Sequence, residues 1–191
     1  MRYSKTHKQE TREKLLDSSR VVAKKNGFGT TGVDALMAAV GMTGGAFYSH
    51  FDSKADLFAS IIEREMEQST QMLAGDESSP AGQVAKLLGA YLSAHHATHP
   101  GEGCALPALG PEIARSSPEI RARVERSVKR VHSSWAERLG ENRDGAWALI
   151  AQCVGAIVIA RAVESKRTQQ EILASSRRFL LEAIPYLTDE A

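Results

Sequence analysis

Three histidines and a cysteine lie close together near the middle of the 191-residue chain. His95 and His99 are four residues apart, so on a helix they share one face, a spacing compatible with a transition-metal site. Two ligands fall short of a closed site, and no acidic or further histidine ligand follows at a fixed offset. A solvated histidine cluster is therefore the favoured interpretation, and we predict no metal and no cofactor.

Cys104, which follows Gly103, has two possible roles. It is either a reactive thiol whose pKa a helix N-terminus lowers or, as a free cysteine more commonly is, a small buried apolar residue. The sequence shows no Ser/His/Asp spacing, no pair of carboxylates in a definable cleft and no phosphate-binding glycine loop after a strand. We therefore predict that the chain is not an enzyme.

Residues with hydrogen-bonding capacity also gather between positions 41 and 58. Val33–Val40 predicts a short helix, Gly41 permits a sharp turn, and Thr43–Phe51 predicts a second short helix. This layout is typical of a helix-turn-helix unit, whose second helix enters the major groove of DNA. Short helix pairs with a glycine turn are also common in all-α cores, so the layout alone leaves a purely structural role open.

Helical signals extend along the whole chain. Ser53 with Asp56 three residues later predicts the capped start of one helix, and Thr168 with Glu171 fits a capping box at the start of another. No run of alternating β-branched residues bounded by hairpin turns occurs. We therefore predict an all-α fold of about nine helices.

Residues 145–163 are apolar nearly all round, with Gln152 and Arg161 as the strongly polar exceptions. The run is marginal for the roughly 20 residues that a bilayer requires, and many of its positions are Ala or Gly. A helix covered on both sides by protein explains it better, either deep in one core or between a core and a second subunit. We predict no membrane span.

The net charge of +1 hides an uneven distribution. Residues 1–60 hold nine Lys and Arg against six Asp and Glu, a balance of +3, and residues 61–191 hold fifteen against seventeen, a balance of −2. A basic N-terminal module on an acidic remainder is a weak electrostatic footprint of nucleic-acid binding. Because the N-terminus shows no apolar secretory segment, a cytoplasmic location is the expectation.

The segment Gly41–Phe58 closely resembles the N-terminal signature of tetracycline-repressor-type (TetR/AcrR) transcriptional regulators. In that family the recognition helix ends in a Tyr-x-His-Phe-like element, and a Ser/Asn-Lys-x-x-Leu element opens the next helix. The specific match is the run Phe47-Tyr48-x-His50-Phe51-x-Ser53-Lys54. The resemblance covers roughly residues 10–60, and beyond them the all-α length and layout agree.

The resemblance implies a ligand-responsive regulator, most simply a homodimeric repressor that a small-molecule effector releases from double-stranded operator DNA. Residues 1–52 would be the three-helix DNA-binding domain, and residues 53–191 a larger helical domain for the effector and for dimerisation. Helices near 143–165 and 168–186 would form the dimer interface as a four-helix bundle. Two-fold symmetry would place the recognition helices about one DNA turn apart, ~34–36 Å, on a palindromic operator.

The predicted DNA-binding residues lie on or beside the helix-turn-helix unit. Family members use the positions of Tyr48 and His50 as phosphate donors, and Lys54, which is placed poorly for the dipole of its own helix, would gain from a phosphate there. The hydroxyl of Thr43 can cap the recognition helix or bond a phosphate. The full predicted set is Thr31, Asp34, Thr43, Gly44, Gly45, Ala46, Tyr48, His50 and Lys54.

The sequence departs from the family at the positions that read bases. Gly44, Gly45 and Ala46 stand where many members carry larger side chains. Specificity would then depend on Thr43, on Asp34, on DNA shape and on the N-terminal arm. The family also commonly has a capping Thr at the position of Gly32, and Thr31 substitutes for it in our prediction.

Residues 76–140 should line the effector cavity if the resemblance holds. A pocket wall and an ordinary core position explain the candidate residues equally well. The candidates are Met66, Tyr91, His95, His99, Cys104, Trp135 and Trp147.

The sequence leaves three hypotheses, of which the TetR-type regulator is favoured. The second is an all-α enzyme or metal-binding protein that uses His95, His99 and Cys104. The third is a helical interaction module whose helix-turn-helix unit is structural only. Replacing Tyr48 and Lys54 would then change no function, whereas phosphate contacts predict weaker DNA binding and a smaller salt dependence.

Overall fold

The computed structural model describes residues 5–74 and 81–183, and throughout these ranges the secondary structure is helical. Nine α-helices and one 3₁₀ helix in the described residues confirm the predicted all-α class. In chain order the elements are α1 (Lys5–Asn26), α2 (Val33–Ala38), the 3₁₀ helix η1 (Gly44–Ser49), α3 (Lys54–Ala74), α4 (Ala81–Tyr91), α5 (Ala94–Thr98), α6 (Ala105–Ala114), α7 (Pro118–Arg138), α8 (Arg143–Ala162) and α9 (Lys166–Ala183).

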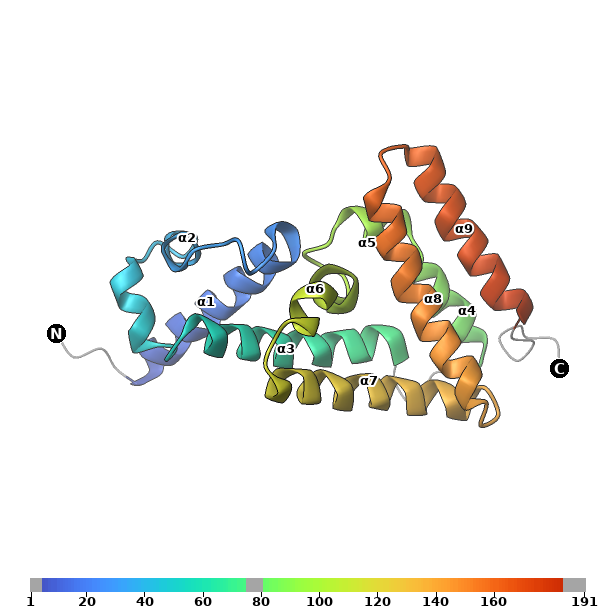
Figure 1. Ribbon diagram of the computed structural model, residues 1–191, viewed down its shortest axis with the longest axis horizontal. Helices are drawn as coiled ribbons and strands as arrows, with labels where there is room; N and C mark the ends of the chain where they lie inside the picture. The colour runs from blue at the N-terminus through green and yellow to red at the C-terminus, as the bar shows by residue number, and fades with distance from the viewer. Residues whose placement is uncertain (1–4, 75–80, 184–191) are drawn as a thin grey trace.

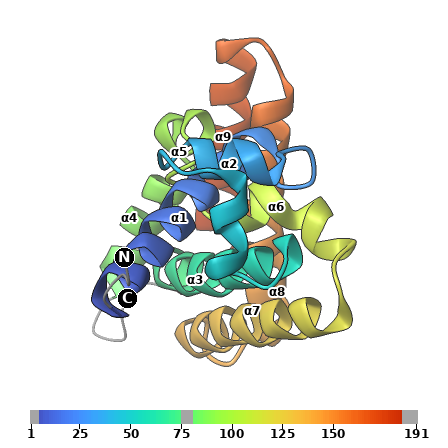
Figure 2. The same cartoon turned by 90° about the vertical axis from the view of Figure 1, so that its left-hand side faces the viewer.

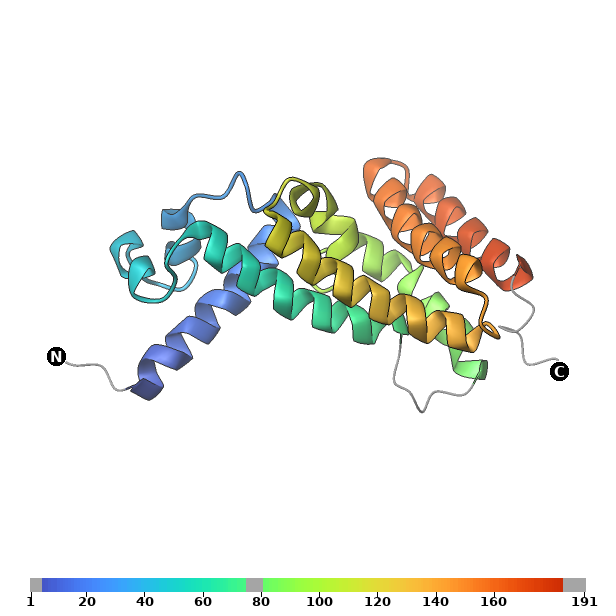
Figure 3. The same cartoon turned by 60° about the horizontal axis from the view of Figure 1, so that its bottom comes forward.

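The molecule is elongated, with its two ends built from different parts of the chain (Figure 1). We call α1, α2 and η1 the head and α4 to α9 the body. The long helices α3 and α7 run side by side between the two ends (Figures 1 and 3). Viewed from the head end, α1, α2 and η1 lie in front of the body helices (Figure 2). Helix α3 therefore connects the head to the body both in sequence and in space.

The start of α3 has the predicted cap. The Ser53 hydroxyl accepts a hydrogen bond from the Asp56 N–H at 3.0 Å, and the Asp56 carboxylate accepts one from the Asp52 N–H at 3.2 Å. These bonds satisfy backbone donors that a helix start leaves free. The short sequence pattern is sufficient here because both partners lie within one helical turn.

The capping box predicted at Thr168 and Glu171 is wrong. Helix α9 already begins at Lys166, and the Thr168 N–H donates to the Ser165 hydroxyl at 3.3 Å. Glu171 instead forms an exposed ion pair with Arg167 at 2.9 Å. An equally suitable hydroxyl three residues earlier in the chain starts the helix.

Two apolar clusters fill the interior. The first joins the head and the first part of α3 to α6 and the start of α7, through side chains such as Phe47, Phe51 and Leu109. The second joins α4, α5, α8 and α9 to the end of α7, around Trp135, whose indole N–H donates to the Leu73 carbonyl at 2.7 Å. Because α3 and α7 contribute to both clusters, the apolar core crosses the boundary predicted at residue 52, which stays a prediction.

A buried ion pair joins the head to the body. The Lys24 ammonium of α1 lies 2.6 Å from the Glu65 carboxylate of α3, and both side chains are 1% exposed. The same ammonium donates to the Gly103 carbonyl, between α5 and α6, at 3.0 Å. Arg20 reaches the other oxygen of Glu65 at 3.0 Å. Buried charges are tolerated when they are paired and hydrogen-bonded in this way.

The apolar run predicted over 145–163 is α8, and it is not enclosed in one core. One face packs into the body, while the opposite face remains exposed and equally apolar. Among the described helices, α8 is the one long and apolar enough to cross a membrane by length and composition, and 39% of that stretch is buried inside the protein. The exposed apolar face consists of Trp147, Ala148, Ala151, Val158, Ile159 and Ala162.

Candidate nucleic-acid interface

The head buries one face of η1 and exposes the other. Phe47 and Phe51 are buried, with ring centroids 5.8 Å apart, and the Arg12 guanidinium covers the Phe51 ring at 4.5 Å. Tyr48 lies between them in sequence and is 69% exposed. Its ring packs edge-on against Phe47, with centroids 5.3 Å apart. Phe47 therefore packs against one edge of the tyrosine ring, while most of the Tyr48 side chain stays open to a partner.

The second helix of the predicted unit exists, but it is a six-residue 3₁₀ helix. Thr43 precedes it in an extended conformation, and its side chain makes no capping hydrogen bond. Because Thr43 is exposed, its hydroxyl remains available to a ligand. The structure thus does not support a capping role for Thr43 and leaves the phosphate-binding role as a prediction.

Gly44 and Gly45 have different surroundings. A Cβ added to Gly44 would lie 1.8 Å from an Asp34 carboxylate oxygen, so the Asp34 side chain occupies the space above this glycine. A Cβ on Gly45 would meet nothing within 4 Å. Gly44 therefore accommodates Asp34, whereas Gly45 contributes an open, flat stretch of exposed surface. Ala46 is half-buried beside them.

His50 is half-buried at the end of η1, and its Nδ1 atom is buried without a hydrogen-bond partner. Burial lowers the pKa of His50, and the nearby positive charges of Lys8 and Arg12 lower it further. The imidazole is therefore predominantly neutral near pH ~7. These two basic residues of α1 also bring positive charge to the edge of the exposed η1 surface.

Thr31 and Lys54 hold the connection between α1 and α2. The Thr31 hydroxyl donates to the Gly27 carbonyl at 2.9 Å, and α2 follows Gly32 without a side-chain cap. The predicted cap at Thr31 is therefore wrong, because its hydroxyl is bonded within the preceding turn. The Lys54 ammonium donates to the Gly29 carbonyl at 3.0 Å and lies 4.9 Å from the centroid of the Phe28 ring. These contacts stabilise a lysine in the first turn of α3, so its presence there does not require a bound phosphate.

A carboxylate that the sequence analysis missed joins this same connection to the body. Glu112 of α6 accepts hydrogen bonds from the backbone N–H groups of Phe28 and Gly29, at 2.9 and 3.0 Å. Phe28 in turn stacks on Phe58 of α3, with centroids 4.7 Å apart. A displacement of α6 would therefore move the connection between α1 and α2. No local sequence signal predicts this contact, because its partners are 84 residues apart.

The seven residues predicted to line the effector cavity do not gather around one cavity in the described part of the chain. Met66, Tyr91, Cys104 and Trp135 are buried in the apolar clusters. The other three lie at the surface: the rings of His95 and His99 stack at 4.2 Å, and the ring of Trp147 stacks on His132 at 4.1 Å.

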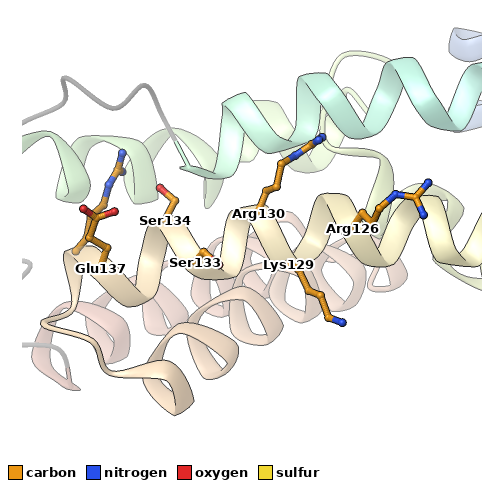
Figure 4. A pocket seen from close by; sticks show the side chains of 7 residues that line it. Arg126, Lys129, Arg130, Ser133, Ser134 and Glu137 are labelled. Atoms are coloured by element: carbon orange, nitrogen blue, oxygen red, sulfur yellow. The ribbon is translucent and has the colours of Figure 1, made fainter.

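Outside the head, the described residues form a basic groove but no cluster of metal ligands. No group of three or more His, Cys, Asp and Glu that could hold a metal occurs there. A groove of ≈ 1010 Å³ follows the outer side of α7, where Arg130 extends toward α3 and pairs with Glu67 at 3.2 Å (Figure 4). Because every lining residue belongs to α7, the groove is an open basic surface. Its lining is Arg126, Lys129, Arg130, Ser133, Ser134, Glu137 and Arg138.

The part of the chain that forms this interface also matches a known family. Residues 15–61, which include α2, η1 and parts of α1 and α3, match the family described as bacterial regulatory proteins, tetR family. This part of the chain belongs to the tetR family. This TetR-family protein is a transcriptional regulator with a DNA-binding helix-turn-helix unit.

Individual relatives agree with this assignment. The HTH-type transcriptional regulator AcrR of Shigella flexneri is 39% identical over 62 residues, which are 32% of this chain and 29% of that regulator. An uncharacterised HTH-type transcriptional regulator in the lacX 3′ region of Lactococcus lactis subsp. lactis is 23% identical over 169 residues, which cover 82% of this chain and 86% of the relative. A TetR transcriptional regulator from Chloroflexus aurantiacus has the same fold, with a TM-score of 0.76 at 20% identity over 93% of this chain and 97% of its own.

Proposed function

We propose that this TetR-family regulator is a cytoplasmic homodimer that represses transcription at a palindromic operator and leaves the DNA when a small molecule binds to the body. The observation that carries the proposal is the exposed surface of η1. Tyr48, at 69% exposure, offers its hydroxyl there, and Thr43 offers a second one that the helix does not use. Both are donors suited to phosphate oxygens.

The composition of the η1 surface indicates how it reads DNA. Gly45 leaves the surface flat, so the backbone can approach the duplex closely, but the small side chains supply few groups that recognise base edges. Most of the affinity then comes from phosphate contacts, and much of the specificity comes from the shape and deformability of the operator.

The outer face of α8 supports the homodimer. Val158 and Ile159 are 44% and 54% exposed, and Phe179 of the adjoining α9 is 61% exposed. Large apolar side chains that are exposed together on one surface favour association. Helices α8 and α9 of two copies can bury these residues against each other, and an isologous contact of this kind gives the two heads the symmetry of a palindrome.

Two polar contacts between head and body support control by a ligand. Glu112 binds the backbone at Phe28 and Gly29, and Lys24 binds the Gly103 carbonyl. A ligand that moves α6 or the segment before it must change these contacts, and with them the position of α2 and η1. Release from DNA requires that the ligand bind the two head positions with different affinity.

Tyr48→Ala is expected to weaken operator binding by about 10- to 100-fold, the range for losing a hydrogen bond to a charged group. The exposed side chain adds little to stability, so thermal unfolding should hardly change. Fluorescence anisotropy with the DNA upstream of the regulator's own coding sequence measures the affinity. Tyr48→Phe separates the hydroxyl from the ring, and Lys86→Ala, an exposed change on α4, is the control. Unchanged binding by Tyr48→Ala and Lys54→Ala together would favour the purely structural helix-turn-helix hypothesis.

Operator affinity is expected to rise as the pH falls from ~8 to ~6, by at most about tenfold per pH unit for each His50. In the free protein burial and the charges of Lys8 and Arg12 hold the pKa of His50 below its ordinary value. A phosphate beside the ring would favour the protonated form and raise that pKa, so binding takes up a proton. His50→Gln should show a flatter pH profile. Equal profiles for the two proteins would remove His50 from the interface.

A further inference from the structure

Arg161, near the end of α8, carries a positive charge without an acidic partner. Its Nε donates to the Ala97 carbonyl at 3.1 Å, and its Nη2 donates to the His96 carbonyl at 2.8 Å. Its Nη1 is buried and has no hydrogen-bond partner. None of the ion pairs found in the described ranges includes Arg161, although burial lowers its pKa and so disfavours the charge. A guanidinium in this setting stabilises a bound anion more strongly than an exposed one does.

Tyr91, the last residue of α4, presents a second donor, whose partner is only a weak one. The residue is 3% exposed, and its hydroxyl makes no hydrogen bond of normal geometry. The Cys104 thiol is a close polar neighbour, and burial raises the pKa of both groups, so both keep their protons. Buried tyrosine hydroxyls usually find a partner. A thiol is a weak hydrogen-bond partner, so a ligand oxygen at this position would replace Cys104 as the partner of the Tyr91 hydroxyl.

The two donors belong to one corner of the body. The His96 ring packs edge-on against Tyr91, with centroids 4.5 Å apart, and the His96 carbonyl is the one that Arg161 binds. A Cβ on Gly103 would lie 3.5 Å from Nη2 of Arg161, and the next residue, Cys104, adjoins the Tyr91 hydroxyl. Apolar residues such as Ala97 and Ile157 belong to the cluster that contains Tyr91 and Cys104, and Ser69 and His96 are polar neighbours.

One cation and one hydroxyl in apolar surroundings define the chemistry of a ligand. A carboxylate supplies one negative charge and two acceptor oxygens, which match a guanidinium and a neutral donor. A phosphate dianion would need a second cation, and the nearby Lys24 is already paired with Glu65. We propose that the effector of this regulator is an apolar molecule with a carboxylate, which binds Nη1 of Arg161 and the hydroxyl of Tyr91. The proposal rests on the proposed control by a small molecule.

The same corner adjoins the contacts with the head. The backbone N–H of Cys104 donates to Nε2 of His96 at 3.0 Å, and the Gly103 carbonyl accepts from Lys24 of α1 at 3.0 Å. A carboxylate that draws Arg161 toward Tyr91 would pull on the His96 carbonyl and therefore on this segment. A ligand bound at this site would therefore act on contacts that lead, through the Gly103 carbonyl and Lys24, to α1.

The test compares carboxylates with their neutral amides. The full-length protein is titrated with hexanoate and benzoate and, separately, with hexanamide and benzamide, and thermal unfolding is followed by tryptophan fluorescence. We expect at least one carboxylate to raise the midpoint saturably while its amide does not. Tyr91→Phe should raise the half-saturating concentration about 2- to 10-fold, the effect of one hydrogen bond. Arg161→Met should abolish the response, and Arg167→Met, at an exposed arginine of α9, should retain it.

Three results would overturn the proposal: amides that act as strongly as carboxylates, no response to either carboxylate, or an undiminished response of both variants. If Arg161→Met does not fold, two measurements still test the carboxylate site. They are the titration of Tyr91→Phe and the comparison of each acid with its amide in the unmodified protein. Operator binding is measured on the same proteins without ligand. If the unmodified protein binds the operator but does not respond to carboxylates, the carboxylate site is contradicted and the proposed function is not. If the unmodified protein does not bind the operator, the proposed function is contradicted.

Discussion

Replacing Glu65 by Leu is expected to lower the free energy of unfolding by about 3–5 kcal/mol, the usual cost of removing one partner from a buried ion pair. Glu65 lies 2.6 Å from Lys24, and each side chain is 1% exposed. Without the carboxylate the Lys24 ammonium stays buried, and the Gly103 carbonyl at 3.0 Å cannot neutralise its charge. Urea unfolding followed by circular dichroism measures the change.

Two further variants show whether burial causes this loss. Glu63→Leu removes a carboxylate from the same helix, but that carboxylate is 70% exposed and pairs with Arg123 at the surface, so we expect a change of at most ~1 kcal/mol. The double variant Lys24→Met with Glu65→Leu removes both buried charges and should recover most of the stability. Equal unfolding of the Glu65→Leu and Glu63→Leu proteins would contradict the buried pair.

Replacing Ile159 by Asp is expected to make the proposed dimer monomeric and to weaken operator binding by about 100-fold or more. In the proposed dimer the 54% exposed Ile159 becomes buried, and a carboxylate there would lose its hydration without gaining a partner. A monomer also loses the gain from holding two heads on one operator, which is worth about 10²- to 10⁴-fold. Sedimentation velocity measures the assembly state, and anisotropy measures the affinity.

Met72→Asp is the matched control for that prediction. Met72 is a 36% exposed apolar residue of α3, which is not part of the proposed interface, and its replacement should leave both the dimer and the operator affinity unchanged. An Ile159→Asp protein that sediments as the unmodified protein does would show that the exposed face of α8 serves another purpose. Thermal unfolding of both variants confirms that each one is folded.

The helices were predictable because the signals that start and stop them are local. The Ser53 and Asp56 cap lies within one turn and is present as predicted. The failed cap at Thr168 shows the limit of such a pattern, since Ser165 is equally able to begin the same helix and does so. For α8, composition predicted a cover on both sides, and the structure identifies the exposed side.

The candidate interface was predictable in place but not in detail. The motif located η1 and the exposed Tyr48, because the order of buried and exposed residues on a short helix follows from the sequence. It did not predict that Lys54 binds the Gly29 carbonyl, or that Glu112 holds the same connection from the other side. Glu65 had a readable signal, because it falls on the buried stripe of α3 four residues after Ile61.

The sequence by itself determined the all-α class, the position of the helix-turn-helix unit and its family, because helical periodicity, caps and a short motif are properties of neighbouring residues. The tertiary structure decided which polar groups are paired and which are not. Lys24 and Arg161 are both cations at the junction of helices distant in sequence, yet one is neutralised by Glu65 and the other binds backbone carbonyls. That difference depends on which helices pack together, and it separates a structural ion pair from a candidate ligand site.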